Sequence, residues 1–201
     1  MISILVVDDH PALRAGLLAV LRTEPGVVPV ATASCPEDLW PQFNRTRPDV
    51  VLLDYHLPGT DGLSICRRLK DVVPAPKVLI YSAYADASLT IPALLAGADG
   101  VVHKGLPANA LSEAIRAVAG GQRVLPPLSQ ELQVAAAQTL EVEDRPILGM
   151  LLAGTDHGDI AATLRLAPDE LDARLDRMIG RLRVEVPTAA ETVPRPAGRG
   201  V

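Results

Sequence analysis

Along the first 120 residues of the chain, two patterns of apolar and polar positions alternate. Short apolar runs rich in β-branched residues predict strands at 2–7, 27–31, 50–53, 77–81 and 100–103. Between them apolar residues recur at helical spacing, which predicts helices at 11–22, 36–45, 62–70, 87–96 and 107–119. Strict alternation of strand and helix favours an α/β fold, in which right-handed crossovers build a parallel sheet covered on both faces.

The alternation of strand and helix patterns ends after Gly120 and Gly121. Residues 121–139 contain Pro126-Pro127, followed by a possible short helix at 129–138. We interpret this segment as a linker. Residues 140–184 show only helical periodicity and predict a small all-α domain. The last segment, 185–201, is rich in Pro, Gly, Ala and Arg and is expected to be disordered.

Carboxylates follow two of the predicted strands. Asp8 and Asp9 come directly after the first strand, and Asp54 follows the uniformly apolar run 50–53. Because open α/β sheets place ligands at the carboxyl ends of their strands, the three acids are expected to converge there. Converging carboxylates need a bound proton or a cation, and oxygen ligands without clustered His or Cys favour Mg²⁺.

The next two strands also end in polar side chains, Ser82 and Lys104. A carboxylate that attacks a phosphoryl donor needs a cation, a hydroxyl donor and an ammonium for the phosphoryl oxygens. Each residue alone also has an ordinary explanation, with Asp54 as a cap or turn residue, Ser82 as a turn hydroxyl and Lys104 as a solvated charge. Their place on successive strand ends favours phosphoryl-transfer chemistry.

Composition excludes several classes of function. With 48% hydrophobic residues the chain is not disordered throughout, and a net charge of -5 with three lysines gives no sign of nucleic-acid or anionic-membrane binding. Cys35 and Cys66 match no metal-ligand spacing and are expected to be reduced thiols. No apolar run has the length of a membrane span and no charged segment of a secretory signal opens the chain, so we expect a cytoplasmic protein.

Four motifs carry a resemblance to the receiver domain of two-component response regulators: 6–11, 52–62, 81–83 and 103–105. The resemblance covers residues 1–120 and implies a flavodoxin-like, doubly wound sheet of five strands in the order 2-1-3-4-5. It also implies that a sensor histidine kinase or a small phosphodonor supplies the phosphoryl group. Such a receiver is not an enzyme beyond promoting its own phosphoryl uptake and hydrolysis.

The same resemblance implies a role for each site residue. Asp54 would be the phosphoacceptor, Ser82 the switch hydroxyl and Lys104 the phosphate partner. Mg²⁺ would be held by Asp8, Asp9, Asp54 and the backbone carbonyl of His56. The sequence departs from the family at one position, because Val101 stands where the family carries its switch aromatic. We therefore expect the coupling between phosphorylation and surface rearrangement to be weaker or to use other residues.

The C-terminal domain resembles the LuxR/NarL-type helix-turn-helix output domain, with helices at 145–153, 156–164 and 168–182. Asp156 and Asp159 have the spacing of a capping box. Where the family carries Thr, Val and Lys at the start of its recognition helix, this chain has different residues, and the candidate DNA-facing set is Glu170, Leu171, Asp172, Arg174 and Arg177. Because phosphate contacts supply most DNA affinity, the carboxylates in this set are expected to oppose binding.

These features identify the chain as similar to NarL/FixJ-type response regulators, which implies a phosphorylation-controlled transcription regulator that forms a homodimer. A second interpretation is a phospho-switched protein-binding or dimerisation module whose output domain does not bind DNA. A third is an aspartyl phosphohydrolase of the haloacid dehalogenase type. That class needs an Asp-x-Asp motif around its nucleophile, and Asp8-Asp9 lacks the spacing.

Overall fold

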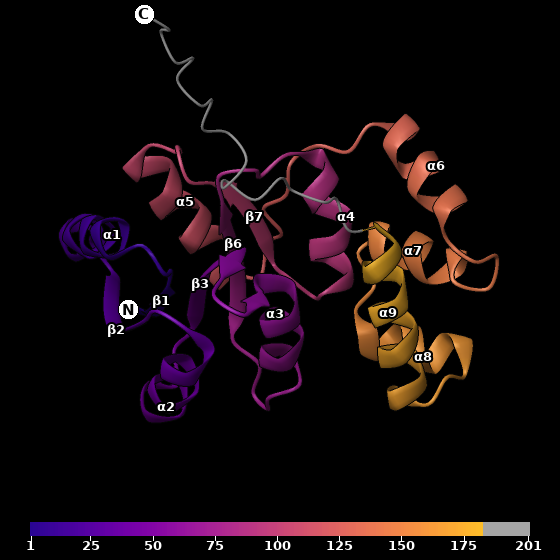
Figure 1. Ribbon diagram of the computed structural model, residues 1–201, viewed down its shortest axis with the longest axis horizontal. Helices are drawn as coiled ribbons and strands as arrows, with labels where there is room; N and C mark the ends of the chain where they lie inside the picture. The colour runs from indigo at the N-terminus through magenta and orange to yellow at the C-terminus, as the bar shows by residue number, and fades with distance from the viewer. Residues whose placement is uncertain (183–201) are drawn as a thin grey trace, which may run out of the picture.

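The computed structural model describes residues 1–182 and contains one main parallel sheet (Figure 1). Its strands are β1 (Ile2–Val7), β2 (Val27–Ala33), β3 (Val50–Asp54), β6 (Lys77–Ser82) and β7 (Gly100–His103). They lie in the order β2-β1-β3-β6-β7, and every neighbouring pair is parallel. The predicted fold class and strand order are therefore confirmed.

Five helices cover the two faces of this sheet. Helices α1 (Pro11–Thr23) and α5 (Ala108–Ala119) pack on one face, and α2 (Pro36–Thr46), α3 (Gly62–Lys70) and α4 (Ala87–Leu95) pack on the other. Along β1, Ile4 and Val6 point to the first face, while Leu5 and Val7 point to the second. Because both faces are covered, the strands are apolar at successive positions, as the sequence predicted.

The predicted bounds agree with these elements to within two residues, but two short strands were missed. Residues His56–Leu57 (β4) and Thr60–Asp61 (β5) form a small antiparallel ribbon. Its turn contains Gly59 with φ of 75°, a left-handed conformation that glycine adopts without a steric penalty. Two-residue strands have no periodicity that a sequence pattern can report.

The C-terminal part consists of α6 (Gln130–Thr139), α7 (Arg145–Leu152), α8 (His157–Leu164) and α9 (Pro168–Leu182). The segment before α6 is tied to the sheet, because the Val101 amide donates to the Val124 carbonyl at 2.8 Å. The expected disordered tail at 185–201 and the last two residues of the predicted output domain lie outside the described residues. Within residues 1–182 no helix is long and apolar enough to span a membrane.

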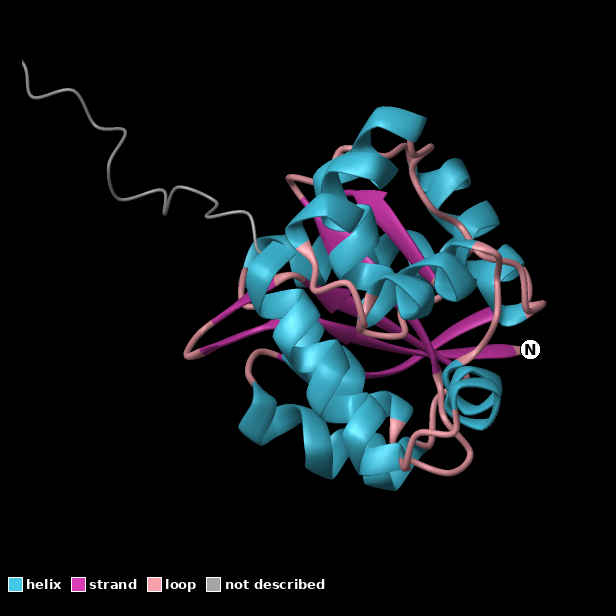
Figure 2. Ribbon diagram, turned by 90° about the vertical axis from the view of Figure 1, so that its right-hand side faces the viewer, coloured by secondary structure: helices cyan, strands magenta, loops and turns pink. Residues whose placement is uncertain are grey.

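One apolar core joins the sheet domain to the C-terminal helices. Leu89 and Ile91 of α4 belong to the same buried cluster as Leu148 of α7 and Leu175 and Met178 of α9. Helix α4 contains no charged residue, and α6, α7 and α9 all contact it. Figure 1 shows α4 between the strands and α9, and Figure 2 shows the C-terminal helices in front of the sheet. Helix α4 is thus an internal layer of the molecule.

Candidate functional site

The sheet brings together polar side chains from the carboxyl ends of β1, β3 and β7. Nζ of Lys104 lies 2.7 Å from Oδ2 of Asp8 and 2.7 Å from Oδ2 of Asp54. Both carboxylates are only 1% exposed. Of the residues expected at these strand ends, Asp8, Asp54 and Lys104 are in direct contact, with one ammonium between two buried carboxylates.

Asp54 is held at the junction of β3 and α3. Its Oδ1 accepts a hydrogen bond from the His56 amide at 3.2 Å. Helix α3 begins directly against its backbone, because a Cβ at Gly62 would collide with the Asp54 carbonyl oxygen and would lie 2.9 Å from Cα of Tyr55. The backbone of Asp54 is therefore in direct contact with the first residue of α3.

Burial sets the electrostatics of the pair. Desolvation raises the pKa of Asp54 above its usual value of 3.8, against the opposing effect of Lys104. Burial opposes the charge of Lys104, but its hydrogen bonds with Asp54 and Asp8 outweigh that effect and raise its pKa. The site therefore contains a carboxylate of increased basicity next to a permanent cation, a combination suited to nucleophilic attack on an anionic group.

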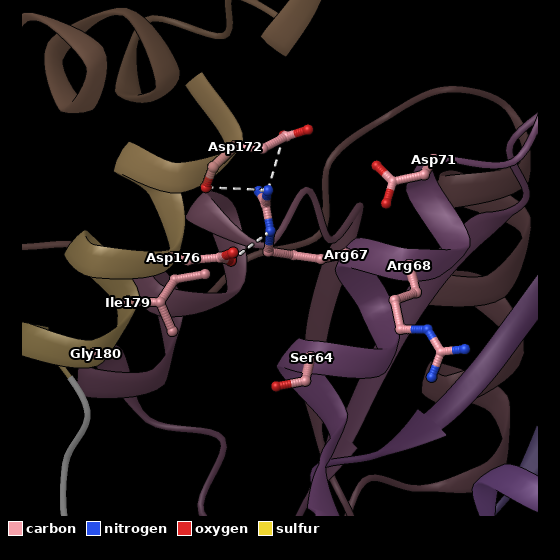
Figure 3. A pocket seen from close by; sticks show the side chains of 8 residues that line it. All are labelled: Ser64, Arg67, Arg68, Asp71, Asp172, Asp176, Ile179 and Gly180. Atoms are coloured by element: carbon pink, nitrogen blue, oxygen red, sulfur yellow. Dashed lines mark hydrogen bonds and ion pairs between the residues drawn. The ribbon is translucent and has the colours of Figure 1, made fainter. Parts of the chain in front are cut away.

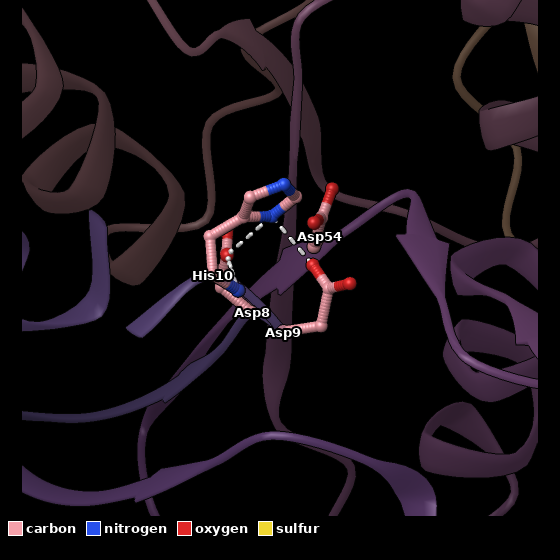
Figure 4. A group of neighbouring side chains, drawn as sticks. All are labelled: Asp8, Asp9, His10 and Asp54. Atoms are coloured by element: carbon pink, nitrogen blue, oxygen red, sulfur yellow. Dashed lines mark hydrogen bonds and ion pairs between the residues drawn. The ribbon is translucent and has the colours of Figure 1, made fainter. Parts of the chain in front are cut away.

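Four side chains form a group whose ligand atoms lie within 4.8 Å of one another: Asp8, Asp9, His10 and Asp54 (Figure 4). Oδ1 of Asp9 is buried and makes no hydrogen bond, although Nδ1 of His10 lies 2.6 Å from it. Oxygen donors from three carboxylates, one of them lacking a hydrogen bond, fit a hard divalent cation such as Mg²⁺. Sequence reasoning did not place His10 in this group, although it directly follows Asp9.

Ser82 lies at the end of β6 and is fully buried. Its Oγ accepts a hydrogen bond from the Tyr84 amide at 3.0 Å. The half-exposed ring of Tyr84 lies 6.1 Å from the ring of His56, so these two side chains meet at the rim of the site.

Val101 is buried, and its amide makes the bond to Val124 described above. The position without the aromatic is thus connected to the segment between α5 and α6.

A second cluster joins α3 to α9 (Figure 3). Nη2 of Arg67 lies 2.7 Å from Oδ1 of Asp172, and its Nε lies 2.8 Å from Oδ1 of Asp176. The Arg67 side chain is 11% exposed, and a groove of about 450 Å³ lies between the two helices. We call these two ion pairs the Arg67 clamp. Sequence reasoning missed it, because Arg67 and Asp172 are 105 residues apart.

The predicted DNA-facing residues of α9 differ in their surroundings. Leu171 is 3% exposed and belongs to the apolar core, so its assignment to the DNA-facing surface is corrected to a packing role. Glu170 pairs with Arg174 at 2.9 Å, one helical turn away, and Arg177 is exposed. Asp172 faces Arg67 of the sheet domain.

The predicted cap of α8 is present in part. Asp156 is the N-cap residue, and its Oδ1 accepts a hydrogen bond from the Asp159 amide at 2.8 Å.

Residues 4–116 match the response regulator receiver domain family. The chain belongs to this family. It is 30% identical over 200 residues to the DNA-binding transcriptional activator DevR/DosR of Mycobacterium tuberculosis, covering 94% of this chain and 92% of that protein. It is 28% identical over 194 residues to the response regulator UvrY of Escherichia coli K12, covering 92% and 89%. These relatives place this response regulator in the NarL/FixJ group of two-component systems.

Solved structures of response regulators have the same fold. A LuxR-family regulator from Aurantimonas matches with a TM-score of 0.61 and 31% identity, over 67% of this chain and 97% of that chain. The response regulator ChrA of a haem-sensing two-component system matches with a TM-score of 0.53 and 31% identity, over 88% of this chain and 87% of that chain. RcsB dimers bound to DNA match with a TM-score of 0.61 over 92% and 93%, and at 20% identity this likeness concerns the fold alone.

Proposed function

We propose that Asp54 of this response regulator accepts a phosphoryl group. The observation that carries the proposal is the Lys104 ammonium between the buried carboxylates of Asp54 and Asp8. A carboxylate oxygen of Asp54 attacks phosphorus, the bond from phosphorus to the donor breaks, and an acyl phosphate forms. The donor is the phosphohistidine of a sensor histidine kinase or a small phosphodonor, and Lys104 pairs with an oxygen of the transferred group.

Asp8, Asp9, Asp54 and the His56 carbonyl are the proposed ligands of Mg²⁺. The bound cation would neutralise charge on the phosphoryl oxygens. The Ser82 hydroxyl accepts the Tyr84 amide and keeps its own proton for donation to a phosphoryl oxygen. With these groups the receiver promotes its own phosphoryl uptake and hydrolysis and needs no further enzymatic activity.

The test of this proposal is phosphoryl uptake from a small phosphodonor in the presence of Mg²⁺, followed by intact-protein mass spectrometry. Asp54→Asn should abolish the uptake, because an amide does not attack phosphorus. Asp61→Asn is the matched control, since Asp61 lies outside the acidic group and caps α3 by accepting the Ser64 amide at 2.9 Å. Uptake by Asp54→Asn at the wild-type level would place the acceptor elsewhere.

We further propose that residues 1–120 form the receiver domain, 121–139 the linker and 140–184 the helix-turn-helix output domain. The output is transcription regulation through α8 and α9, in line with the relative named a DNA-binding transcriptional activator. Because Asp172 and Asp176 are engaged by Arg67, α9 must leave α3 before it meets DNA. Phosphorylation at Asp54 would act on α3 through Gly62 and favour release and homodimer formation.

A second candidate function is supported by the Arg67 clamp itself. The acids of α9 already have a protein partner, and carboxylates near phosphate groups weaken DNA binding. In that case the released α9 binds a basic protein surface or a second copy of this chain.

An anisotropy titration with fragmented genomic DNA, with and without phosphodonor, separates the two candidates. Sequence-selective binding that appears on phosphorylation supports transcription regulation. Dimerisation without DNA binding supports the protein-binding module.

A further inference from the structure

His157 lies where the C-terminal helices meet the receiver. It is the first residue of α8, directly after the N-cap Asp156. A Cβ at Gly97, which follows α4 with φ of 80°, would lie 3.4 Å from Cε1 of His157 and 3.1 Å from Cγ of Lys70. The imidazole therefore packs against the receiver backbone, in a place where even an added methyl group would be tightly fitted.

The imidazole has a buried nitrogen without a partner. Nε2 of His157 is inaccessible to solvent and makes no hydrogen bond in the part of the chain that the structure describes. A proton added at Nε2 would create a buried N–H donor with no acceptor and would add a charge to the contact. Both changes raise the free energy of the docked state, the first because the donor is unsatisfied and the second because the charge is buried.

The elements around His157 present charges of both signs. Arg67 comes from α3, Arg123 from the segment after α5, Asp172 from α9 and Asp156 from the cap of α8. Arg67 is bound by the carboxylates of α9, and Arg123 donates to the Leu151 carbonyl at 3.0 Å, so both guanidinium groups are held in place.

Two further charged residues of the receiver lie near this contact and are already paired. The ammonium of Lys70 lies 2.5 Å from a carboxylate oxygen of Asp99. Asp99 also pairs with Lys77 at 3.0 Å, so its carboxylate is shared between two lysines. A protonated His157 would therefore add positive charge next to two fixed guanidinium groups, and Asp99 would offer it no free carboxylate.

We propose that His157 makes the docking of the C-terminal helices on the receiver sensitive to pH, with the neutral imidazole closing the contact and the protonated imidazole opening it. The inference does not rest on phosphorylation at Asp54. His157 takes no part in the phosphoryl chemistry, so its response to pH is a separate regulatory input. Acidification is then a second route to the released form of α9.

The surroundings of the imidazole ring determine in which direction docking changes with pH. Burial, with a further contribution from Arg67, lowers the pKa of His157 below its usual value of 6.5 in the docked state. The undocked state therefore binds the proton more strongly. Docking is strongest above about pH 6.5 and weakens as the pH falls through the lowered pKa, by at most about tenfold per pH unit for one proton.

One neighbouring group responds in the opposite sense. Burial raises the pKa of Asp71 on the receiver side of the groove, and Asp172 raises it further. Protonation of Asp71 removes negative charge beside Asp172 and strengthens docking.

The experiment measures docking in the full chain by fluorescence energy transfer. Labels are placed at Asn109→Cys on α5 and Arg177→Cys on α9, both exposed positions, in a Cys35→Ser background. Cys66 is fully buried and remains unlabelled. From about pH 8 to pH 5.5 the wild type should lose transfer below about pH 6.5, while His157→Gln should stay constant. His103→Gln, at an exposed receiver histidine, is the matched control and should behave as the wild type.

Several results would overturn the inference. Transfer in the wild type that does not change with pH, or an unchanged pH response in His157→Gln, would remove His157 as the sensor. If His157→Gln fails to dock at any pH, an NMR titration of the Cε1 proton in the wild type decides, because a pKa at or above 6.5 contradicts the proposal. An Asp54→Asn background should keep the response, which separates this inference from the phosphoacceptor assignment.

Discussion

Removal of the positive charge of Arg67 should release α9 from the receiver. We consider Arg67→Gln, which keeps a long polar side chain but breaks both ion pairs of the Arg67 clamp. Arg67 is 11% exposed, whereas its partners Asp172 and Asp176 are 47% and 67% exposed. Solvent screens pairs with exposed partners, so each contributes about 0.5–1 kcal/mol.

The two pairs together therefore contribute about 1–2 kcal/mol, which corresponds to about a five- to thirtyfold change in the docking equilibrium. The variant also leaves Asp71 on the same groove as the two acids of α9, without the intervening cation. That repulsion acts in the same direction.

The assay is the energy-transfer measurement described above, at about pH 7.5. Arg68→Gln is the matched control, since Arg68 is the next residue and carries the same charge, but its guanidinium lies over the Trp40 ring, 4.5 Å from the centroid. Adding salt to about 0.5 M should weaken docking in the wild type but not in Arg67→Gln, where it screens only the repulsion among the remaining acids.

A double-mutant cycle with Asp172→Asn tests whether the effect passes through the ion pair. The coupling energy should be about 0.5–1 kcal/mol. Wild-type docking by Arg67→Gln, or a coupling energy close to zero, would refute the reasoning.

Three further variants test the remaining assignments. Asp9→Asn should weaken Mg²⁺ binding strongly in a calorimetric titration, because one of few protein carboxylates is lost, and equal affinity would remove Asp9 from the site. Ser82→Ala should reduce phosphorylation-dependent dimerisation only modestly in sedimentation experiments, because the receiver lacks the switch aromatic, and complete loss of the dimer would contradict weak coupling. Glu170→Thr with Asp172→Lys should raise nonspecific DNA affinity by roughly tenfold at low salt, and tight selective binding by the unmodified chain at physiological salt would exclude the acidic-helix argument.

The sheet could be predicted from sequence because its signals are local. The run Val50–Leu53 is uniformly apolar because both faces of β3 are covered, and Asp54 marks its end. Once the five strands are known, parallel topology places Asp8, Asp54 and Lys104 at one edge, so the receiver site follows from strand ends alone.

The contacts of α9 could not be predicted in this way. Periodicity shows that Leu171, Leu175 and Met178 share one face, but it does not reveal which neighbour covers that face. Asp172 has the same local signal whether it faces solvent, DNA or Arg67. Only the docked arrangement shows that the acid has a partner in the receiver.

The apolar layer formed by α4 has a consequence for how the chain is made. Residues 120–182 follow α5, and at about 5–20 residues per second the ribosome needs about 3–13 seconds to add them. Until α7 and α9 have been made and have folded, the outer face of α4 lacks the cover that they provide. A nonsense mutation after α5 should therefore produce a receiver fragment with an exposed apolar face on α4, which we expect to be prone to aggregation and degradation.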